Sequence, residues 1–534
     1  MKGNAPKDRR SADTPAEVIV NMAPRVPDFD PTLGIDVVLP PLKGTSANKL
    51  VTIGDSVTHG FQSGAIFNTR ISWPKIVAWE IGCDATFRFP LYEGFGGIPL
   101  NIEYLLRALE HKYGDAISWW ELPGAGFDLR SLMAQIEDYW ERGPGSTVKR
   151  TNRAMHNLAV YGWDIRDVLS RTANNLQAAM HTPKDDVFAQ VVENANIRAA
   201  LGVYSSMDPG DTVLDAARKL GQEGALPGSG GDATTPGIET LVVFIGANNV
   251  LGSVTQLKVS WSAKGYDALG SKDRYTVWCP SHFAAEYQQL VQRLKAVSAR
   301  HVILVNVPHV TIAPIARGVN RKVGAGSRYF PFYTRPWITD EQFNEKDDPT
   351  ITENQVRAID SAVDQYNDTI ANEVRACRQA GLDWYVLDIA GMLDRLAARR
   401  YINDAQARPD WWTRYDLPAA LNQLDPVPDS RFFSSGPQGR EQGGLFSLDG
   451  IHPTTITYGL IAQEVINVMQ RAKVALYYND GVTLRQGPVQ VDFDRLLRLD
   501  SLIAHPPRSL SSDMKTLGWL DETADIIGKL NPFS

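Results

Sequence analysis

The sequence predicts an α/β fold built around a parallel, doubly wound sheet. Short runs of apolar and β-branched residues alternate along the chain with longer segments whose apolar residues recur at helical spacing. Several of the apolar runs end at glycine or proline, as buried strands commonly do. Strands that alternate with helices in this way pair in parallel through right-handed crossovers.

The first predicted strand covers residues 50–54 and ends at Asp55 and Ser56, before a helical pattern at residues 72–81. Ligands bind at the carboxyl ends of strands in such sheets, so Ser56 is placed like a nucleophile whose backbone N–H faces a developing anion. The alternative is that Asp55 and Ser56 only cap the next helix.

Four further strands complete the predicted sheet of five. They cover residues 155–162, 239–246, 301–308 and 384–389. Helical patterns follow or separate them at residues 165–180, 191–220, 283–298, 352–380 and 454–473. This order predicts helices on both faces of the sheet.

The length of 534 residues predicts one large domain with insertions, or two domains, because single cores stop growing near about 250–300 residues. We expect an N-terminal arm at residues 1–47, a main domain at 48–473 with insertions at about 90–145, 315–349 and 393–446, and a C-terminal extension at 474–534 that docks on it.

Two of these insertions, at residues 315–349 and 393–446, are rich in aromatic residues and interrupt the pattern near the carboxyl edge of the sheet. Long loops at such an edge often form lids or binding loops, so one hypothesis is an aromatic cover for an apolar or ring-shaped group. The other is that these aromatic residues pack the insertions together.

Composition excludes several classes of function. A net charge of −7 provides no electrostatic footprint for nucleic acid or an anionic membrane, and no run of about 18 apolar residues predicts a transmembrane helix. Residues 1–10 lack the apolar core of a secretory signal, which favours a cytoplasmic protein; a secreted protein whose leader had been removed would look the same.

The sequence predicts no metal or cofactor. Cys83, Cys279 and Cys377 lie too far apart for a disulfide framework or a zinc site, and we expect them to be core thiols. A Gly-x-Ser-x-Gly elbow, a Walker loop and a His-Glu-x-x-His motif are all absent from the sequence.

A serine nucleophile needs a base, commonly a histidine oriented by a carboxylate. His452 follows Asp449 by three residues in a polar turn before a helix, a spacing that brings the two side chains together. The alternative is that both are ordinary turn and capping residues. His59 and His309 also follow strands, and either line the site or belong to the core or surface.

Acyl transfer also needs hydrogen-bond donors for an oxyanion. Gly162 follows the second predicted strand and offers a backbone N–H, and Asn248 follows the third and offers a side-chain amide. With the N–H of Ser56 they make three donors. Each alone is also compatible with simple turn chemistry.

In chain order, these segments resemble the four sequence blocks of the GDSL/SGNH hydrolases. The blocks are Gly54-Asp55-Ser56, Gly162 after residues 157–161, Gly246-Ala247-Asn248, and residues 449–453, with weaker similarity at residues 304–308, 366–367 and 386–388. The resemblance spans residues 50–472. Asn249 stands where the third block usually has aspartate.

The resemblance implies a flavodoxin-like three-layer α/β/α fold and ester hydrolysis through an acyl-enzyme. Carried over by position, Ser56 is the nucleophile, His452 the base and Asp449 its orienting carboxylate. Ser56, Gly162 and Asn248 form the oxyanion hole.

One position of this assignment has a rival, because Gly126, in residues 122–128, competes with Gly162. We prefer Gly162, since a strand precedes it.

The predicted function is therefore a serine-dependent carboxylic ester hydrolase, esterase-like or lipase-like, acting on a small-molecule or lipid acyl ester. A carbohydrate O-acetyl esterase is an alternative within the same chemistry. A non-catalytic ligand-binding protein on the same scaffold is the alternative from another class, motivated by Asn249 and the large insertions.

Overall fold

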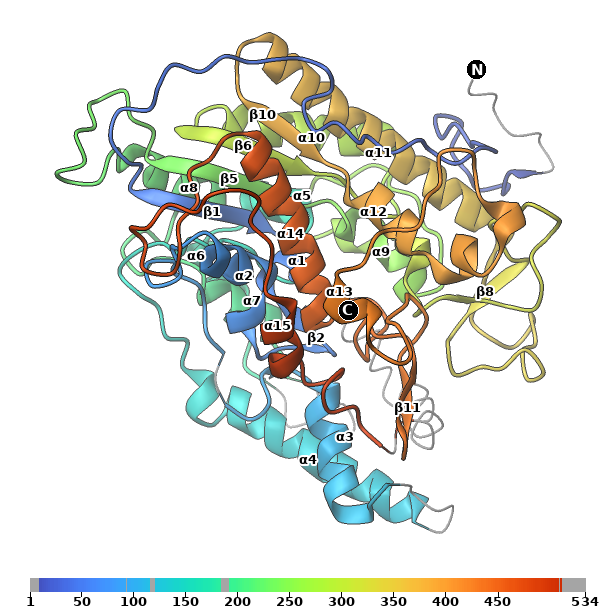
Figure 1. Cartoon of the computed structure of the whole chain (residues 1–534). Helices are drawn as coiled ribbons and strands as arrows, with labels where there is room; N and C mark the ends of the chain where they lie inside the picture. The colour runs from blue at the N-terminus through green and yellow to red at the C-terminus, as the bar shows by residue number, and fades with distance from the viewer. Residues whose placement is uncertain (1–8, 93, 116–120, 184–191, 509, 511–534) are drawn as a thin grey trace.

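The computed structural model describes residues 9–92, 94–115, 121–183, 192–508 and 510, and has a four-stranded parallel sheet at its centre (Figure 1). The strand order is β1 (Asn48–Gly54), β5 (Ile238–Phe244), β6 (Ala299–Val305) and β10 (Trp384–Leu387). All neighbouring pairs are parallel, with Gly54 opposite Phe244 and Val243 opposite Leu304. The predicted strands at these four places are confirmed.

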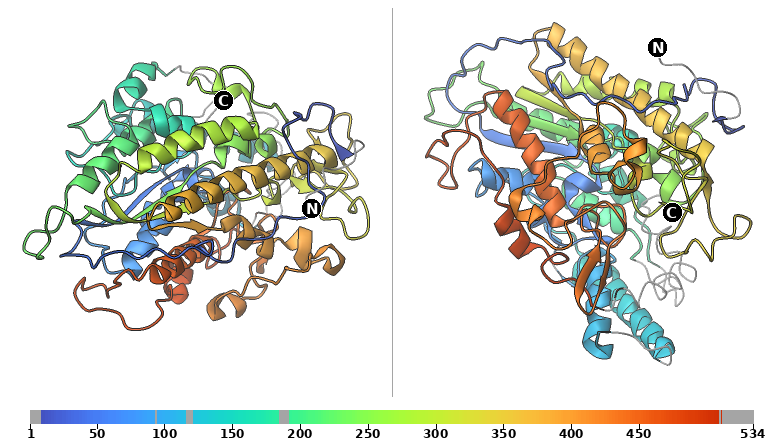
Figure 2. Two further views of the ribbon diagram at one scale, coloured as in Figure 1. Left: turned by 90° about the horizontal axis from the view of Figure 1, so that it is seen from above. Right: turned by 45° about the vertical axis from the view of Figure 1, so that its right-hand side comes forward.

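Helices cover both faces of the sheet, so the observed architecture is a layered α/β/α arrangement. Figure 2 shows α10 and α11 on one face and α14 on the other, where it packs against α2. The α-helices of the described ranges are α1 (Ser56–His59), α2 (Trp73–Glu80), α3 (Ile102–Tyr113), α4 (Leu122–Glu141), α5 (Ile165–Ser170), α6 (Ala173–Ala179), α7 (Ala195–Leu201), α8 (Val213–Gln222), α9 (Asn248–Thr255), α10 (Pro280–Leu294), α11 (Glu353–Gln379), α12 (Ile389–Leu396), α13 (Ala419–Asn422), α14 (Thr455–Arg471) and α15 (Phe493–Leu499).

Short strands and helical turns complete the described elements. The strands are β2 (Phe61–Gln62), β3 (Ala65–Ile66) and β4 (Ile98–Pro99) in one antiparallel sheet, β7 (Arg317–Gly318), β8 (Phe332–Thr334) and β9 (Ile351–Thr352) in a second, and β11 (Ser434–Gly436) and β12 (Gly439–Gln442) in a third. Turns of 3₁₀-helix cover Thr69–Ile71, Pro144–Ser146, Lys272–Arg274, Val310–Ile312 and Ala405–Ala407, and a π-helical turn covers Ala398–Ile402.

The fifth predicted strand, at residues 155–162, does not form a regular strand. The segment follows the free edge of β1 with three backbone hydrogen bonds: Thr52 N to His156 O at 2.8 Å, Leu158 N to Thr52 O at 2.8 Å and Val160 N to Gly54 O at 3.1 Å. One parallel bridge, between Thr52 and Asn157, joins the segment to β1. The Asn157 side chain strengthens this junction, since it accepts from Thr52 Oγ1 at 3.0 Å and donates to Thr58 O at 2.9 Å.

Two long predicted helices are also divided. The pattern at residues 165–180 forms α5 and α6, because Thr172 starts a new helix with a capping box to Asn175. Within the pattern at residues 191–220, α7 and α8 are likewise separate, and Thr212 caps α8 together with Asp215. Residues 184–191 lie outside the described residues.

The N-terminal arm lies over the surface in its described part, residues 9–47 (Figure 1). Asn21 N donates to Ser361 Oγ on α11 at 3.0 Å, and Val18 and Val20 are fully buried. Further along, Pro31 O accepts a hydrogen bond from Val386 N of β10 at 3.0 Å. The arm therefore occupies part of the edge of the sheet, where unpaired backbone groups would otherwise be exposed.

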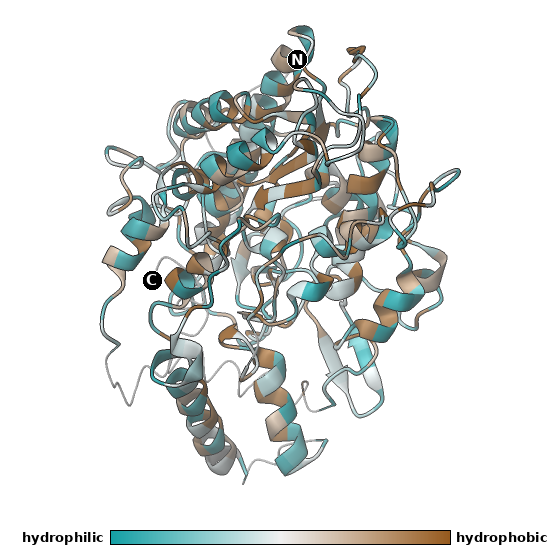
Figure 3. Ribbon diagram, turned by 90° about the vertical axis from the view of Figure 1, so that its left-hand side faces the viewer, coloured by the Kyte–Doolittle hydropathy of each residue, from teal (hydrophilic) through white to brown (hydrophobic). Residues whose placement is uncertain are grey.

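Helices α3 and α4 form a separate projection, at the bottom of Figure 1. Their inner faces share a small apolar cluster with the β2–β4 sheet, to which Leu105, Leu129, Ile136 and Trp140 contribute. In Figure 3 these helices carry a hydrophobic and a hydrophilic face, whereas the central strands are largely hydrophobic. This insertion thus has a core of its own.

The C-terminal extension packs along the main body through residues 474–508. Leu496 and Phe493 of α15 lie so close to Gly459 of α14 that a Cβ atom at Gly459 would be 2.4 Å from Leu496 Cδ1. The rest of the extension, apart from residue 510, lies outside the described residues.

Two predictions from composition have direct counterparts in the structure. Cys83, Cys279 and Cys377 are buried free thiols, as predicted. Among the helices that the structure describes, none combines the length and apolarity needed to span a membrane.

Candidate active site

Ser56 lies at the carboxyl end of β1, as the first residue of the short helix α1. Asp55 caps this helix by accepting a hydrogen bond from Val57 N at 3.1 Å. The backbone N–H of Ser56 belongs to the first turn, whose N–H groups have no acceptor within the helix. The sequence left open whether Asp55 and Ser56 cap the helix or Ser56 offers its N–H to a ligand, and the structure has both a cap and a serine N–H without an acceptor in the helix.

Gly54 makes this strand-to-helix turn sterically feasible. A Cβ atom at Gly54 would lie 2.4 Å from Thr58 Oγ1 and 2.6 Å from Phe244 O. The carboxyl group of Asp55 is fully enclosed beside it, and burial raises its pKa to about 7. The turn between β1 and α1 therefore packs closely at Gly54 and buries the carboxyl group of Asp55.

His452 brings its imidazole to Ser56 from the other end of the chain. Its Nε2 lies 2.8 Å from Ser56 Oγ, and its Nδ1 lies 2.9 Å from Asp449 Oδ2. Because a carboxylate only accepts, the proton of the neutral ring is assigned to Nδ1, and Nε2 is left to accept from the serine hydroxyl. The three side chains form a continuous hydrogen-bonded chain in the order expected of a nucleophile, a base and an orienting acid.

The carboxylate of Asp449 is saturated with hydrogen bonds. Oδ1 accepts from Ile451 N at 2.9 Å, His452 N at 2.8 Å and Ser447 Oγ at 3.2 Å, and Oδ2 accepts from Gly64 N at 3.0 Å in addition to His452. Burial alone would raise the pKa of Asp449, but the imidazole of His452 and these donors lower it below its ordinary value. Asp449 is therefore held as a charged, immobile acceptor.

A hairpin that the sequence analysis did not identify fixes Asp449 from the opposite side. Its turn joins β2 to β3, and Ser63 in this turn adopts a left-handed φ of +50°. Ser63 N donates to Ser447 Oγ at 2.9 Å, and Ser63 Oγ donates to Glu103 Oε1 at 2.8 Å. No sequence signal marks this contact, because it joins residues 384 positions apart.

The ring of Phe61, in the same hairpin, supports the imidazole directly. The centroids of Phe61 and His452 are 4.5 Å apart. Ser56 and His452 keep only 5% and 8% of their surface exposed. In such a desolvated site hydrogen bonds and charges act more strongly than in water.

Gly162 lies at the end of the segment beside β1, with a φ of +75° that suits glycine. The preceding residue is fixed by His59, whose Nδ1 accepts from Tyr161 N at 3.0 Å. His59 Nε2 lies 2.9 Å from Tyr92 Oη, which donates to Ala199 O. His59 is thus a neutral ring, protonated on Nε2, and burial lowers its pKa to about 3.

Asn248 begins α9 directly after β5 and reaches back to the same turn. Its Nδ2 donates to Trp163 O at 2.8 Å. This hydrogen bond uses one of the two N–H groups of the Asn248 amide. Asn249 accepts from Ile165 N at 3.5 Å, while its own Nδ2 is buried and makes no hydrogen bond within the described residues. Both asparagines therefore tie α9 to the loop that contains Gly162.

A buried ion cluster supports the next part of this loop. Lys272 Nζ lies 3.0 Å from Asp164 Oδ2 and 2.9 Å from Asp167 Oδ2, and these two aspartates form the capping box of α5. The Gly162 turn thus lies between two fixed points. His59 binds the residue before it, and the first turn of α5, with its capping box and its ion pairs to Lys272, follows it. Sequence patterning did not single out Lys272.

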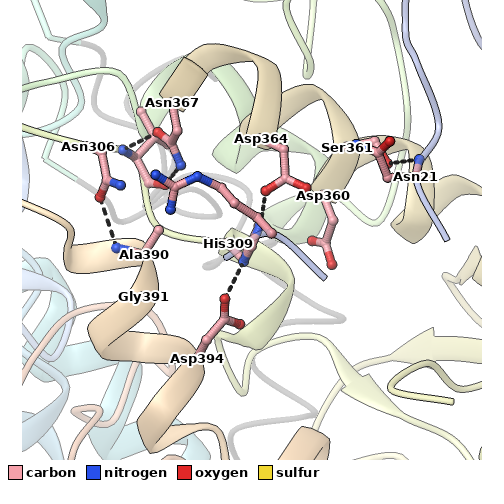
Figure 4. A network of polar contacts seen from close by, with 12 residues as sticks. Asn21, Asn306, His309, Asp360, Ser361, Asp364, Asn367, Ala390, Gly391 and Asp394 are labelled. Atoms are coloured by element: carbon pink, nitrogen blue, oxygen red, sulfur yellow. Dashed lines mark hydrogen bonds and ion pairs between the residues drawn. The ribbon is translucent and has the colours of Figure 1, made fainter. Parts of the chain in front are cut away.

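Two other sequence candidates lie elsewhere. Gly126 is inside α4, the fifth residue of that helix, where its backbone N–H is used in the helical ladder. His309 belongs to a buried acidic cluster, 3.0 Å from Asp364 Oδ1 and 3.2 Å from Asp394 Oδ2 (Figure 4). Asp364 and Asp394 help raise the pKa of His309 to about 10 despite its burial.

The aromatic residues of the two later insertions mostly pack inside them. Tyr329, Phe330 and Tyr333 are buried, and Tyr401 contacts the rings of Trp411 and Trp412. Most of these aromatic side chains thus pack the insertions together, and Phe330 and Tyr333 also line a cavity between the two insertions. Across the residues that the structure describes, no group of three or more His, Cys, Asp or Glu side chains is arranged to hold a metal ion.

Neither the protein-family models nor the curated proteins contain a match to the chain.

Proposed function

We propose that this protein is a serine-dependent carboxylic ester hydrolase that acts through an acyl-enzyme. The observation that carries the proposal is the hydrogen-bonded chain from Ser56 Oγ through His452 to Asp449, with separations of 2.8 and 2.9 Å. A serine, a neutral imidazole and a charged carboxylate in this order are the means by which a weak hydroxyl nucleophile is activated.

In the first step, Ser56 Oγ attacks the ester carbonyl carbon while His452 Nε2 takes the hydroxyl proton. Asp449 stabilises the imidazolium that results. The carbonyl oxygen becomes an anion, for which the N–H groups of Ser56 and Gly162 and the second N–H of Asn248 are the proposed donors.

In the second step, His452 returns the proton to the alcohol oxygen as the carbon–oxygen bond breaks. This releases the alcohol and leaves the acyl group esterified to Ser56. Water then attacks the acyl carbon, with His452 again as base, and the carboxylic acid leaves as Ser56 regains its proton. No cofactor takes part in this sequence.

The sheet supports the same proposal. When residues 155–162 beside β1 are counted as a strand, they and β1, β5, β6 and β10 make five strands. Numbered by their order in the chain, the strands lie side by side in the order 2-1-3-4-5, which is the flavodoxin-like arrangement. Ser56, Gly162 and Asn248 each follow one of three adjacent members of this sheet. This agrees with the resemblance of the sequence to the GDSL/SGNH hydrolases, and an acyl ester, lipid-derived or small, is the proposed substrate.

The proposal is tested by labelling the purified chain with a fluorophosphonate, which reacts with activated serines. We expect one label per chain on Ser56, located by peptide mass spectrometry. Ser262 is a built-in control, because its Oγ lies 2.7 Å from His282 Nδ1 outside the candidate site. Folded protein that takes up no label, or labels Ser262 equally, contradicts the proposal.

A series of p-nitrophenyl esters of increasing acyl length then defines the substrate. Rates that rise with chain length support a lipid-like acyl ester. A preference for acetylated saccharides over every such ester assigns the chain instead to carbohydrate deacetylation.

A further inference from the structure

A second candidate site lies between the two aromatic insertions. It is a cavity of about 250 Å³ enclosed by the β7–β8 region, the π-helical turn Ala398–Ile402 and residues 430–432. Its apolar wall includes Phe330, Tyr333 and Phe432. The cavity contains neither Ser56 nor His452 in its lining, so what binds there is a question separate from ester hydrolysis.

The charged residues that line this cavity are all positive. Five arginines line it, and no aspartate or glutamate does: Arg317, Arg328, Arg399, Arg400 and Arg431. They come from three segments far apart in the sequence. Guanidinium groups are therefore presented to one small volume from several directions.

Three of these arginines are paired with carboxylates. Arg317 lies 2.6 Å from Asp340 Oδ1, and Arg431 lies 2.6 Å from Asp429 Oδ2. Arg400 lies 2.7 Å from Asp360 Oδ2, and Asp360 is not part of the cavity lining. These ion pairs neutralise three of the five arginines. Arg328 and Arg399 are the other two.

Arg328 adds a buried cation to the lining. It is only 5% exposed, yet its Nε and Nη1 make no hydrogen bond within the described residues. Its guanidinium stacks over the Tyr329 ring, 4.8 Å from the centroid. Burial would lower the pKa of Arg328, but Tyr329, Tyr401, Asp360 and Asp364 raise it, so Arg328 remains charged beside the cavity.

Arg399 adds a second cation without a carboxylate partner in the described part of the chain. Its Nη2 donates to Gly318 O at 2.7 Å, and its guanidinium lies over the Phe330 ring at 4.9 Å. The nearest acidic cluster, Asp360, Asp364 and Asp394, is bound by Arg400 and a charged His309, and Arg328 supplies the third positive charge beside it. The lining consequently retains positive charge.

We propose that this cavity binds phosphate or the phosphoryl group of a small molecule. A carboxylate is planar and is satisfied by a single guanidinium fork, whereas a phosphate offers oxygens in tetrahedral directions that suit arginines converging from several segments. The volume is below the range of about 300–1,000 Å³ typical of pockets for drug-sized ligands, which favours a small phosphorylated compound.

The test is calorimetric titration of the full chain with inorganic phosphate, in a buffer free of phosphate and at constant ionic strength set with sodium chloride. We expect one saturable site per chain. Arg328→Gln and Arg399→Gln should each weaken binding about tenfold or more, the cost of a charged hydrogen bond. Arg508→Gln, at an exposed pair with Asp115 outside the cavity, should leave the affinity unchanged.

Thermal unfolding separates a ligand site from a structural role. Without phosphate, Arg328→Gln should lower Tm, because nearby Asp360 and Asp364 favour its charge in the folded chain, and it should abolish the rise in Tm that phosphate causes in the wild type. A lower Tm with unchanged phosphate binding overturns the proposal. If this variant does not fold, Arg399→Gln provides the binding test.

Further titrations identify the source of the ligand. Tighter binding of glycerol 3-phosphate than of inorganic phosphate assigns the site to a phosphorylated metabolite, and the reverse order assigns it to free phosphate. Acetate that binds as tightly as phosphate, or the absence of any saturable phosphate site, contradicts the inference.

Discussion

His452 Nε2 lies 2.8 Å from Ser56 Oγ, although 396 positions separate the two residues in the chain. Ser56 stands at the end of β1, and His452 stands in the turn that precedes α14. The hairpin between β2 and β3 connects them, since its Phe61 ring contacts His452 and its Gly64 N–H binds Asp449. The geometry of the candidate site thus depends on three separate segments.

Removal of the nucleophile or the base should abolish ester hydrolysis. Ser56→Ala and His452→Ala are each expected to lower kcat for short p-nitrophenyl esters by about 10⁴-fold or more, because neither residue can act without the other. Circular dichroism and Tm should show a folded protein in both. Ser262→Ala is the control, and retained turnover in both site variants would refute the assignment.

Asp449→Asn should lower kcat by about 10³- to 10⁴-fold with little change in KM. The amide nitrogen would face His452 Nδ1, which would favour the tautomer that carries its proton on Nε2. That nitrogen could then no longer accept from Ser56. Steady-state kinetics at several pH values checks this, and a change confined to KM would contradict it.

His59 should act as a positioning residue through Tyr161 N. His59→Leu removes the acceptor of that N–H, lets the Gly162 turn shift, and is expected to lower kcat about 100-fold, the effect of losing one oxyanion donor. His59→Asn keeps an acceptor near the Nδ1 position and should recover most of the activity. Because burial lowers the pKa of His59 to about 3, the pH profile above pH 5 should not change. Equal losses in both variants would assign His59 a purely structural role.

His309 should make stability depend on pH in the alkaline range. Its pKa is raised to about 10 in the folded chain from an ordinary 6.5, so its contribution is complete below pH 6.5 and is lost as the pH rises toward 10. The unfolding free energy should therefore fall by about 1.4 kcal/mol per pH unit in that window from this group.

His309→Gln should remove this slope and destabilise the protein by about 5 kcal/mol at pH 6, since it leaves buried carboxylates unpaired. Urea unfolding at pH 6, 8 and 9.5, followed by tryptophan fluorescence, measures both effects. His181→Gln, at an exposed pair with Glu193, is the control and should change neither. An unchanged slope in His309→Gln would show that other groups cause it.

Gly54→Ala should destabilise the fold through the strand-to-helix turn. The new methyl group would meet Thr58 Oγ1 and the backbone oxygen of Phe244, and the expected cost is about 3 kcal/mol. Gly324→Ala, where a Cβ atom would meet nothing within 4 Å, is the matched control. Denaturant unfolding compares the two, and equal midpoints would contradict the steric argument.

The sequence by itself determined the four regular strands, the turn at Ser56 and the pairing of Asp449 with His452. These features are local: a strand is encoded by a short apolar run, and an aspartate three residues before a histidine meets it within one turn. The carboxyl-edge rule for parallel sheets then placed Ser56, Gly162 and Asn248 at one end.

Only the tertiary structure decided how these pieces are held. It left the edge segment with a single bridge to β1, brought the Ser63 turn against Asp449, and placed His309 among acids instead of beside Ser56. It also gathered arginines from three segments around one cavity. Contacts between distant segments depend on the packing of the whole chain, which no local pattern of residues encodes.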